Sequence, residues 1–361
     1  MKILTITFHR SKNYGAVLQA YALQRALVQC GYETAIVDYS RVIDPKKCRS
    51  LTGKLKLFAI KLLDVLRRSD RRRFVKRFEQ FVTERLALTE KYDNYESLEI
   101  APPKADMYLI GSDQVWNITY RYRPEFFADF APIGVKVASY AASIARYNYT
   151  EEQMSHFAQG IKGITPVSVR EKSGKKFLKE KFGIDSEVHL DPVFLLSAEE
   201  WRAIAKHPSI SEKYILCYAL TASKKMETVA KNLKRLTGYK IVSISASSHS
   251  FLNGDINIFD AGPEEFLGYI DNAELVLTTS FHGTAFSVVF EKNFYNFTSD
   301  YYASRTTDLL ELFSLTNRIC VDANSVSCES IDYSVARKIK EKKISNAYRY
   351  LESLKEADNA Q

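Results

Sequence analysis

Residues 275–290 read LVLTTSFHGTAFSVVF, an apolar run that passes through a short polar stretch into a segment of small residues. We expect a buried strand to end at residues 278–280 and a helix to begin near Thr284. His282 and Gly283 would then lie in a turn at the carboxyl edge of a sheet, where open α/β folds bind ligands. The free N–H groups and positive dipole end of the helix attract anions, and a glycine lets an anion approach the backbone. This turn predicts an anion site beside His282; the alternative is a histidine that merely caps the helix.

The remainder of the chain repeats this alternation of apolar runs and amphipathic segments. In the first half we predict strands at 3–8, 34–39, 107–110, 135–142 and 166–169, and helices at 15–30 and 174–182. In the second half we predict strands at 214–220, 240–244 and 275–278, and helices at 224–236, 263–270 and after Gly283. A lysine-rich helix at 331–358 closes the chain. Such alternation is typical of a parallel, doubly wound α/β sheet, and 361 residues exceed the roughly 250–300 at which one core stops growing. We therefore expect an α/β protein of two domains.

Composition excludes several classes of protein. No uncharged apolar run of about 18 residues occurs, and the amino terminus MKILTITFHR lacks the apolar length and cleavage site of a signal peptide, so we expect a cytoplasmic protein. The five cysteines show no C-x-x-C spacing, which argues against a zinc site and a disulfide scaffold. The first βαβ unit lacks a G-x-G-x-x-G motif, so a dinucleotide site is improbable. We expect free thiols, no metal and no cofactor.

One segment makes the chain basic. Residues 46–77 hold thirteen lysines and arginines against Asp64 and Asp70, which exceeds the net charge of +8 of the whole chain. Apolar residues such as Leu55 and Phe58 are interleaved among the cations. Such a helix can pack its apolar stripe on the domain, lie on an anionic membrane at the inner face, or bind nucleic acid. We expect no nucleic-acid partner and leave the first two alternatives open.

Six motifs occur in an order and at a spacing that resemble the polysaccharide pyruvyl transferase family over nearly the whole chain. They are NYGAVLQAYAL at 13–23, GSDQVWN at 111–117, ASYAAS at 138–143, VSVREKSG at 167–174, LDPVFLL at 190–196 and SFHGTAFS at 280–287. The resemblance implies two Rossmann-like domains that face a cleft, as in GT-B glycosyltransferases. We expect a first domain at 1–190 with a basic helical insertion at about 41–100, a second domain with the donor site at 191–330, and residues 331–361 packing back.

The same resemblance implies a reaction. The enolpyruvyl part of phosphoenolpyruvate moves onto two hydroxyls of one sugar in a surface polysaccharide, exopolysaccharide or capsule, which gives a cyclic pyruvate ketal and phosphate. The partners are phosphoenolpyruvate and a glycan acceptor, free or lipid-linked. Ketal formation requires an acid that protonates the methylene carbon or the departing phosphate, and a base that deprotonates a hydroxyl.

We assign His282 as the acid and Asp113 as the base or as a clamp on the acceptor hydroxyls. The alternative for Asp113 is an Asx-turn after a strand. Arg170 is expected to grip the carboxylate or phosphate of the donor. The alternative for Arg170 is an ion pair with Glu171 or another carboxylate that stabilises the fold.

The other predicted contacts cluster at two helix starts. For the donor they are Ser280, Phe281, Gly283 and Thr284, and for the acceptor Asn13, Tyr14, Gly15 and Trp116. The alternative for residues 13–15 is a helix cap with a tight turn, and the alternative for Trp116 is a place in the core.

One position departs from the family. Other branches often have an arginine two positions before the histidine, in a R-L-H-G string, where this chain has Ser280. Arg305, at the start of a predicted helix beyond the next strand, is our candidate to supply the missing charge at the donor.

Two rival functions remain from the sequence. A GT-B glycosyltransferase that uses a nucleotide sugar would share the architecture. A non-enzymatic adaptor would bind a membrane or nucleic acid through residues 46–77 and would not need His282.

Overall fold

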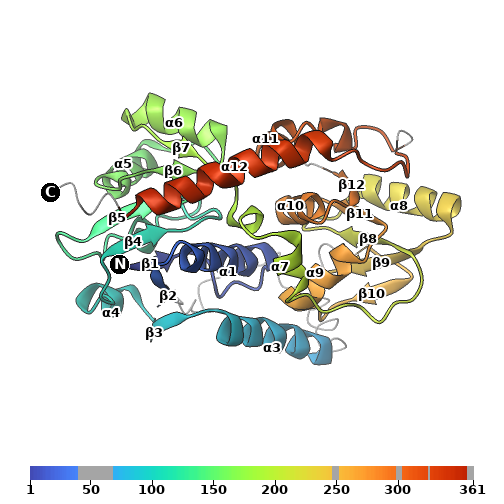
Figure 1. The fold of residues 1–361 in the computed structure, drawn as a ribbon, viewed down its shortest axis with the longest axis horizontal. Helices are drawn as coiled ribbons and strands as arrows, with labels where there is room; N and C mark the ends of the chain where they lie inside the picture. The colour runs from blue at the N-terminus through green and yellow to red at the C-terminus, as the bar shows by residue number, and fades with distance from the viewer. Residues whose placement is uncertain (40–67, 246–251, 298–302, 324–325, 356–361) are drawn as a thin grey trace, which may run out of the picture.

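Two five-stranded parallel sheets form the centre of the protein (Figure 1). The computed structural model describes residues 1–39, 68–245, 252–297, 303–323 and 326–355. The first sheet has the order β3-β2-β1-β4-β5, with β1 (Lys2–Ile6), β2 (Glu33–Tyr39), β3 (Leu88–Tyr92), β4 (Met107–Ile110) and β5 (Lys136–Ser139). The second has the order β10-β9-β8-β11-β12, with β8 (Tyr214–Tyr218), β9 (Lys240–Ile244), β10 (Ile256–Ile258), β11 (Leu275–Thr278) and β12 (Asn293–Asn296). Both orders are doubly wound, so the predicted α/β fold of two Rossmann-like domains is confirmed.

Helices connect these strands. They are α1 (Tyr14–Gln29), α3 (Arg68–Arg85), α4 (Tyr95–Ile100), α5 (Glu151–Ile161), α6 (Lys172–Phe182), α7 (Ala198–Arg202), α8 (Lys224–Thr237), α9 (Pro263–Asp271), α10 (Phe281–Val289), α11 (Ala303–Leu312) and α12 (Ser334–Ser353). A short parallel pair, β6 (Ser168–Val169) and β7 (Glu187–Val188), adjoins the first sheet through single bridges at Ala142. The domain limits 1–190 and 191–330 stay predictions.

Helix α1 joins the two domains. It starts because Asn13 has an extended backbone and its Oδ1 accepts a hydrogen bond from Ala16 N at 3.2 Å. The ring of Tyr14 then stacks on Phe266 of α9 with centroids 4.3 Å apart, and Tyr14 Oη donates to Ala261 O at 2.9 Å. Burial of aromatic rings at this junction fixes where the start of α1 lies relative to the second domain.

Helix α12 ties the second domain back to the first and runs across both of them in Figure 1. Near its end Tyr350 Oη donates to Ser139 O at 2.7 Å, and Tyr32 Oη donates to Leu351 O at 2.7 Å. The predicted closing helix that packs back is confirmed. No helix in the described part of the chain is long and apolar enough to cross a membrane.

Helix α3 is the described part of the basic segment, and it packs on the second domain. Four of its apolar side chains are buried in the core between the domains: Phe74, Phe78, Phe81 and Val82. Arg73 Nε lies 2.6 Å from Asp260 Oδ2, and Arg85 Nη2 lies 2.8 Å from Glu264 Oε1. For residues 68–85 the packing alternative is therefore confirmed, because the apolar stripe faces protein. Residues 46–67 of the basic segment lie outside the described residues.

The expected insertion at about 41–100 is too long at its carboxyl end. Residues 88–92 are the strand β3, which pairs in parallel with β2 through Leu88 and Tyr92. Its sequence LTEKY has three consecutive polar residues between two apolar ends, so a search for continuous apolar runs overlooks this edge strand.

Candidate active site

Helix α10 begins three residues earlier than the sequence predicts. Ser280 is its N-cap, because Ser280 Oγ accepts a hydrogen bond from Gly283 N at 3.4 Å. His282 therefore lies in the first turn of the helix and not in a loop before it. The alternative that His282 merely caps the helix is wrong, since Ser280 does so. The N–H groups of Phe281 and His282, at the positive end of the helix, make no hydrogen bond within the described residues, so they are available to an anion.

Two predicted donor contacts on α10 are wrong. Gly283 uses its N–H for the cap, and a methyl group at this position would lie 2.4 Å from Thr278 Oγ1, so the glycine permits close packing on β11. Thr284 is buried; its Oγ1 donates to Ser280 O at 3.0 Å and accepts from Asn296 Nδ2 at 2.9 Å. Among the described residues, neither Gly283 nor Thr284 lines the cavity that His282 borders, because the helix turns both inward onto the second sheet.

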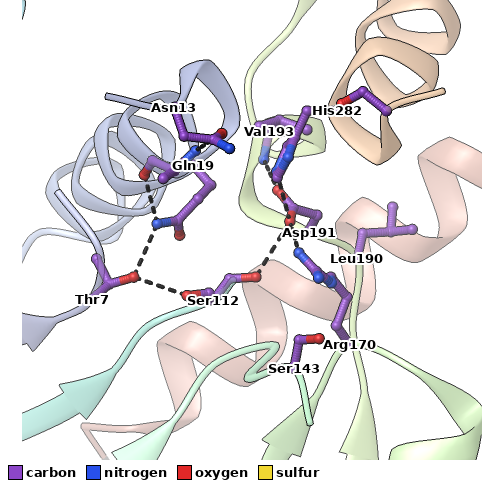
Figure 2. A network of polar contacts seen from close by, with 12 residues as sticks. Thr7, Asn13, Gln19, Ser112, Ser143, Arg170, Leu190, Asp191, Val193 and His282 are labelled. Atoms are coloured by element: carbon purple, nitrogen blue, oxygen red, sulfur yellow. Dashed lines mark hydrogen bonds and ion pairs between the residues drawn. The ribbon is translucent and has the colours of Figure 1, made fainter. Parts of the chain in front are cut away.

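Asp191 is the charged partner of His282 and was not predicted as a site residue from the sequence. His282 Nε2 lies 3.4 Å from Asp191 Oδ2, close enough for charge attraction although the ring is not aligned for a hydrogen bond (Figure 2). Asp191 Oδ1 accepts from Val193 N at 3.2 Å, and Ser112 Oγ donates to Oδ2 at 3.4 Å. The signal was present as the LDPVFLL motif, which lies where the chain passes from one domain to the other.

Arg170 also contacts Asp191. Its Nη1 donates to Asp191 Oδ2 at 2.6 Å and its Nε to Glu171 Oε1 at 3.2 Å, while its guanidinium lies over the ring of Phe281 at 4.5 Å. The ion-pair alternative for Arg170 is confirmed. Nη2 is buried and has no hydrogen-bond partner among the described residues, so a donor contact by Arg170 stays a prediction and would use this nitrogen. The other two nitrogens of the guanidinium, Nε and Nη1, are already bonded to the carboxylates of Glu171 and Asp191.

The carboxylate of Asp191 and the guanidinium of Arg170 stabilise each other's charge. Burial alone would raise the pKa of Asp191, but the neighbouring His282 and then Arg170 hold that pKa well below its usual range. Burial alone would lower the pKa of Arg170, but Glu171 and Asp191 raise it above its usual range. Asp191 is therefore a fixed anion between a cation of the first domain and the histidine of the second.

The start of α1 contributes a close contact to His282. A methyl group on Gly15 would lie 1.9 Å from His282 Nδ1, so only glycine leaves room for the imidazole. Tyr14 is wrong as an acceptor contact, because its ring and hydroxyl are buried between the domains. Asn13 acts as the helix cap, as its alternative predicted, and also borders the cavity described below.

Trp116 is also wrong as an acceptor contact. Its side chain is completely buried, its Nε1 donates to Phe126 O at 3.0 Å, and it packs on Phe127 and Phe157. The alternative of a core tryptophan is confirmed. No face of the indole is open to a sugar ring.

A cavity of about 230 Å³, here called the histidine cavity, lies between the carboxyl edges of the two sheets. Its walls are formed by the loops that follow β1, β4, β8 and β11, and by residues of α11. Its polar lining includes Asn13, Asp113, Gln114, Ser280, His282 and Arg305. The structure thus brings together His282, Asp113 and Arg305, which are far apart in the sequence.

Asp113 has a left-handed backbone, with φ of 70°. Its carbonyl oxygen accepts from Val115 N at 2.8 Å and Ser143 N at 3.0 Å, and its side chain closes no turn. The Asx-turn alternative is therefore wrong, because the backbone makes these bonds. A residue held in a sparsely populated conformation beside a cavity is a candidate for function.

Arg305 borders the cavity from the first turns of α11 and is largely buried. Gln114, in the amide orientation that satisfies its neighbours, accepts from Arg305 Nη1 and Nη2 at 3.0 and 3.1 Å. The first domain therefore holds a guanidinium of the second domain beside Ser280. Together with the start of α10, Arg305 makes this part of the cavity favourable for an anion.

Comparison with known proteins gives one family. A family model described as polysaccharide pyruvyl transferase matches residues 13–301, which is most of the chain. No curated protein is similar enough to count as a match.

Solved structures resemble the chain over nearly its whole length. One is a putative UDP-N-acetylglucosamine 2-epimerase from Listeria monocytogenes, with 12% identity, 94% of each chain covered and a TM-score of 0.49. Another is the glycosyltransferase SsfS6 from Streptomyces sp. SF2575 in complex with thymidine diphosphate, with 12% identity, 99% of each chain covered and a TM-score of 0.47. These TM-scores are below 0.5, so the fold assignment rests on the strand order of the two sheets.

Proposed function

We propose that this chain, which belongs to the polysaccharide pyruvyl transferase family, uses phosphoenolpyruvate to place a cyclic pyruvate ketal on one sugar of a glycan. Two hydroxyl oxygens of the sugar bond to C2 of the donor, and the bond from C2 to the phosphate oxygen breaks. One hydroxyl proton goes to the methylene carbon, which becomes a methyl group, and the other leaves with the phosphate.

The observation that carries this proposal is the histidine cavity. Phosphoenolpyruvate has a phosphate and a carboxylate on a three-carbon frame, so it needs two positive features at a fixed separation. Arg305 and the unbonded N–H groups at the start of α10 border one cavity and are such features. The phosphate fits Arg305, which takes the role of the arginine that Ser280 replaces.

His282 has the position of an acid in this cavity. Its imidazole borders the cavity, and the buried carboxylate of Asp191 lies 3.4 Å from its Nε2. We assign His282 to deliver a proton to the methylene carbon or the departing phosphate. Asp113, on the wall contributed by the first domain, is the base that receives a hydroxyl proton. Asp191 acts through His282 and is a positioning residue.

The test of the proposed function is product formation. Wild-type protein, incubated with phosphoenolpyruvate and a panel of aryl and lipid-linked glycosides, should release phosphate only with an acceptor and should yield a ketal methyl signal by NMR. His282→Asn should keep the fold but lower kcat by roughly 10²-fold or more, the usual scale for a lost acid–base group. His207→Asn, a change at an exposed histidine outside the cavity, is the matched control and should not alter kcat. Wild-type turnover in His282→Asn would remove the histidine from the mechanism.

We also propose peripheral contact with an anionic membrane through residues 46–77, which suits a lipid-linked acceptor. Each engaged cation contributes on the order of 1 kcal/mol, and salt weakens the attraction. Arg71 and Arg72 of α3 are exposed, whereas Arg73 pairs with Asp260. Wild-type protein should sediment with anionic liposomes at low salt, and a variant with Arg67, Arg68, Arg71 and Arg72 neutralised should not. Equal sedimentation of the two proteins would show that the segment is ordinary surface.

A further inference from the structure

A second cavity, of about 260 Å³, lies between α6, α11 and α12. Glu171 lines it from the first domain and Asp308 from the second. Phe281 and Arg305 line both this cavity and the histidine cavity, so their side chains form a wall between the two. A molecule in the second cavity is therefore kept apart from the reacting atoms, and the proposed reaction assigns no ligand to this place.

Three polar atoms of residues that line the second cavity are buried and lack a hydrogen-bond partner within the described residues. They are Arg170 Nη2, Glu171 Oε2 and Asp308 Oδ2. The side chains of Arg170 and Glu171 are only 3% and 2% exposed, so water does not reach them freely. Because an unpaired buried polar atom is costly, a ligand that bonds these atoms would be favoured.

The two unpaired carboxylate oxygens require a hydrogen-bond donor, and a cationic donor suits them best. Burial, and then the charge of Glu171, raise the pKa of Asp308, which shows that the two acids repel each other; Lys172 has only a smaller, opposite effect. A hydroxyl group would donate one hydrogen bond and leave the repulsion in place. An ammonium group donates three hydrogen bonds and carries the positive charge that relieves the repulsion.

The cations of the lining require an acceptor with a negative charge. Arg170 Nη2 lacks an acceptor, and Lys172, Lys175 and Lys343 also line the cavity without forming an ion pair in the part of the chain that the structure describes. A carboxylate accepts charge-assisted hydrogen bonds from such groups. It carries one negative charge, so Glu171 and Asp308 repel it less than they would repel a phosphate dianion.

The ammonium and the carboxylate can belong to one small molecule. Arg170 Nε and Glu171 Oε1 are 3.2 Å apart, so the unpaired atoms of these same two side chains lie within reach of two groups on one carbon atom. The rest of the lining is apolar and includes Val188, Leu190, Leu309 and Leu312. An aliphatic side chain on that carbon atom would be removed from water against this wall, whereas a polyol would leave the wall without an apolar partner.

We propose that the second cavity binds an α-amino acid with an aliphatic side chain, such as free leucine, as an effector that does not react. Its ammonium group bonds Glu171 and Asp308, its carboxylate bonds Arg170, and its side chain packs on the apolar wall. Because the ligand bonds one acid of each domain and lies against the wall that includes Arg305, it holds the donor side of the histidine cavity in place. Binding of the amino acid does not rest on the proposed function, but its effect on the donor does.

Calorimetry without phosphoenolpyruvate tests the site. L-leucine, L-isoleucine or L-valine should bind saturably to wild-type protein. Compounds that lack one of the three groups should bind at least about tenfold more weakly, the scale of a lost charge-assisted hydrogen bond or of a lost apolar contact. They are 4-methylpentanoate without the ammonium, 3-methylbutylamine without the carboxylate, and glycine without the side chain. No binding of any of the three amino acids would overturn the inference, and so would equal binding of 4-methylpentanoate or tighter binding of myo-inositol.

Two variants locate the binding. Asp308→Asn removes one negative charge with little change of shape, and Leu312→Trp fills the cavity, so each should weaken the binding of the amino acid about tenfold or more. Lys176→Gln is the matched control, because Lys176 is an exposed lysine of α6 that does not line the cavity. If Leu312→Trp does not fold, Asp308→Asn decides alone. Unaltered binding in the folded variants would place the amino acid elsewhere and overturn the inference.

Titrations with the donor separate this inference from the proposed function. A saturating concentration of the amino acid should lower the Kd for phosphoenolpyruvate about fivefold or more, and Asp308→Asn should abolish this shift. Amino-acid binding by a protein that binds no phosphoenolpyruvate would leave the site in place while the proposed function fails. Phosphoenolpyruvate binding with a Kd that the amino acid does not change would leave the function intact and overturn the effector role.

Discussion

Gly15 makes the most restrictive residue-level contact in the candidate site. A methyl group there would lie 1.9 Å from His282 Nδ1, far inside any real contact, and Asp191 Oδ2 lies 3.4 Å from Nε2 on the other side of the ring. We expect Gly15→Ala to lower kcat by roughly 10²-fold, because the ring is pushed away from the reacting atoms. Gly174→Ala is the control, since a methyl group there makes only ordinary contacts of 3.6 Å or more. Circular dichroism should show both variants folded; wild-type kcat in Gly15→Ala would show that the position of the ring does not matter.

Arg305 carries the second residue-level prediction. In the proposed function Arg305 supplies the charge that Ser280 lacks, so Arg305→Ala should raise the KM for phosphoenolpyruvate by about tenfold or more, the scale of a lost charge-assisted hydrogen bond. Arg305→Lys should recover part of the loss, since an ammonium keeps the charge but not the fork. Steady-state kinetics at varied donor concentration measure both. A donor KM that neither change moves would place the phosphate elsewhere.

Some residues predicted for the site border the cavity and others do not, and the burial of their side chains explains the difference. His282, Asp113 and Arg305 follow strands or begin helices, and topology brings such positions to one edge of a parallel sheet. Tyr14 and Trp116 occupy equally suggestive motifs, but their rings face inward, which the sequence does not show. Asp191 was missed because its partners lie in other segments and become visible only in three dimensions.

At the scale of elements, α3 shows how a charged helix can join two domains. Its cations dominate the composition, yet its aromatic residues are buried against α1 and α9, and several of its arginines pair with acids of the second domain. Phe78→Ala should lower the free energy of unfolding by about 3–5 kcal/mol, as expected for a large buried side chain. Lys76→Ala, on the exposed face, should change it by less than about 0.5 kcal/mol. Urea unfolding curves measure both, and equal midpoints would mean that α3 is loosely attached.

Element boundaries were predicted best where the pattern was least ambiguous. The strands at 107–110, 240–244 and 275–278 match β4, β9 and β11 residue for residue, because each is a continuous or nearly continuous apolar run. Helix α10 was predicted to start too late because Ser280 was read as the end of a strand and not as a cap. The edge strands β3 and β10 were missed, since half-exposed edges have no apolar run.

At the scale of the whole molecule, His189 links pH to the packing of α12. Its ring lies between Tyr140 and Tyr350, and burial, with a smaller effect of Lys343, lowers its pKa to about 4 from an ordinary value of 6.5. Between pH 4 and pH 6.5 the unfolded chain therefore binds a proton at His189 that the folded chain does not bind. The stabilisation from this site is complete above pH 6.5 and is lost as the pH falls toward 4, by up to roughly 3 kcal/mol. Urea midpoints between pH 7 and pH 5 should fall less steeply in His189→Gln than in wild type; parallel slopes would contradict this.

The two-domain architecture could be predicted from the length of the chain and from its alternating strand and helix patterns. The contacts between the two domains could not. The interface depends on α1, α3 and α12, whose buried faces are set by partners distant in sequence, such as Tyr14 with Phe266. No local pattern identifies such a partner. The histidine cavity could not be predicted from the sequence for the same reason, because its walls come from both domains.

The most direct test of the account is a calorimetric titration of wild-type protein and of Arg305→Ala with phosphoenolpyruvate, and of wild type with uridine and thymidine diphosphate. The account predicts that wild type binds phosphoenolpyruvate, that Arg305→Ala binds it about tenfold more weakly or worse, and that neither nucleotide binds. Saturable binding of a nucleoside diphosphate, with no binding of phosphoenolpyruvate, would contradict the account and favour a glycosyltransferase that uses a nucleotide sugar.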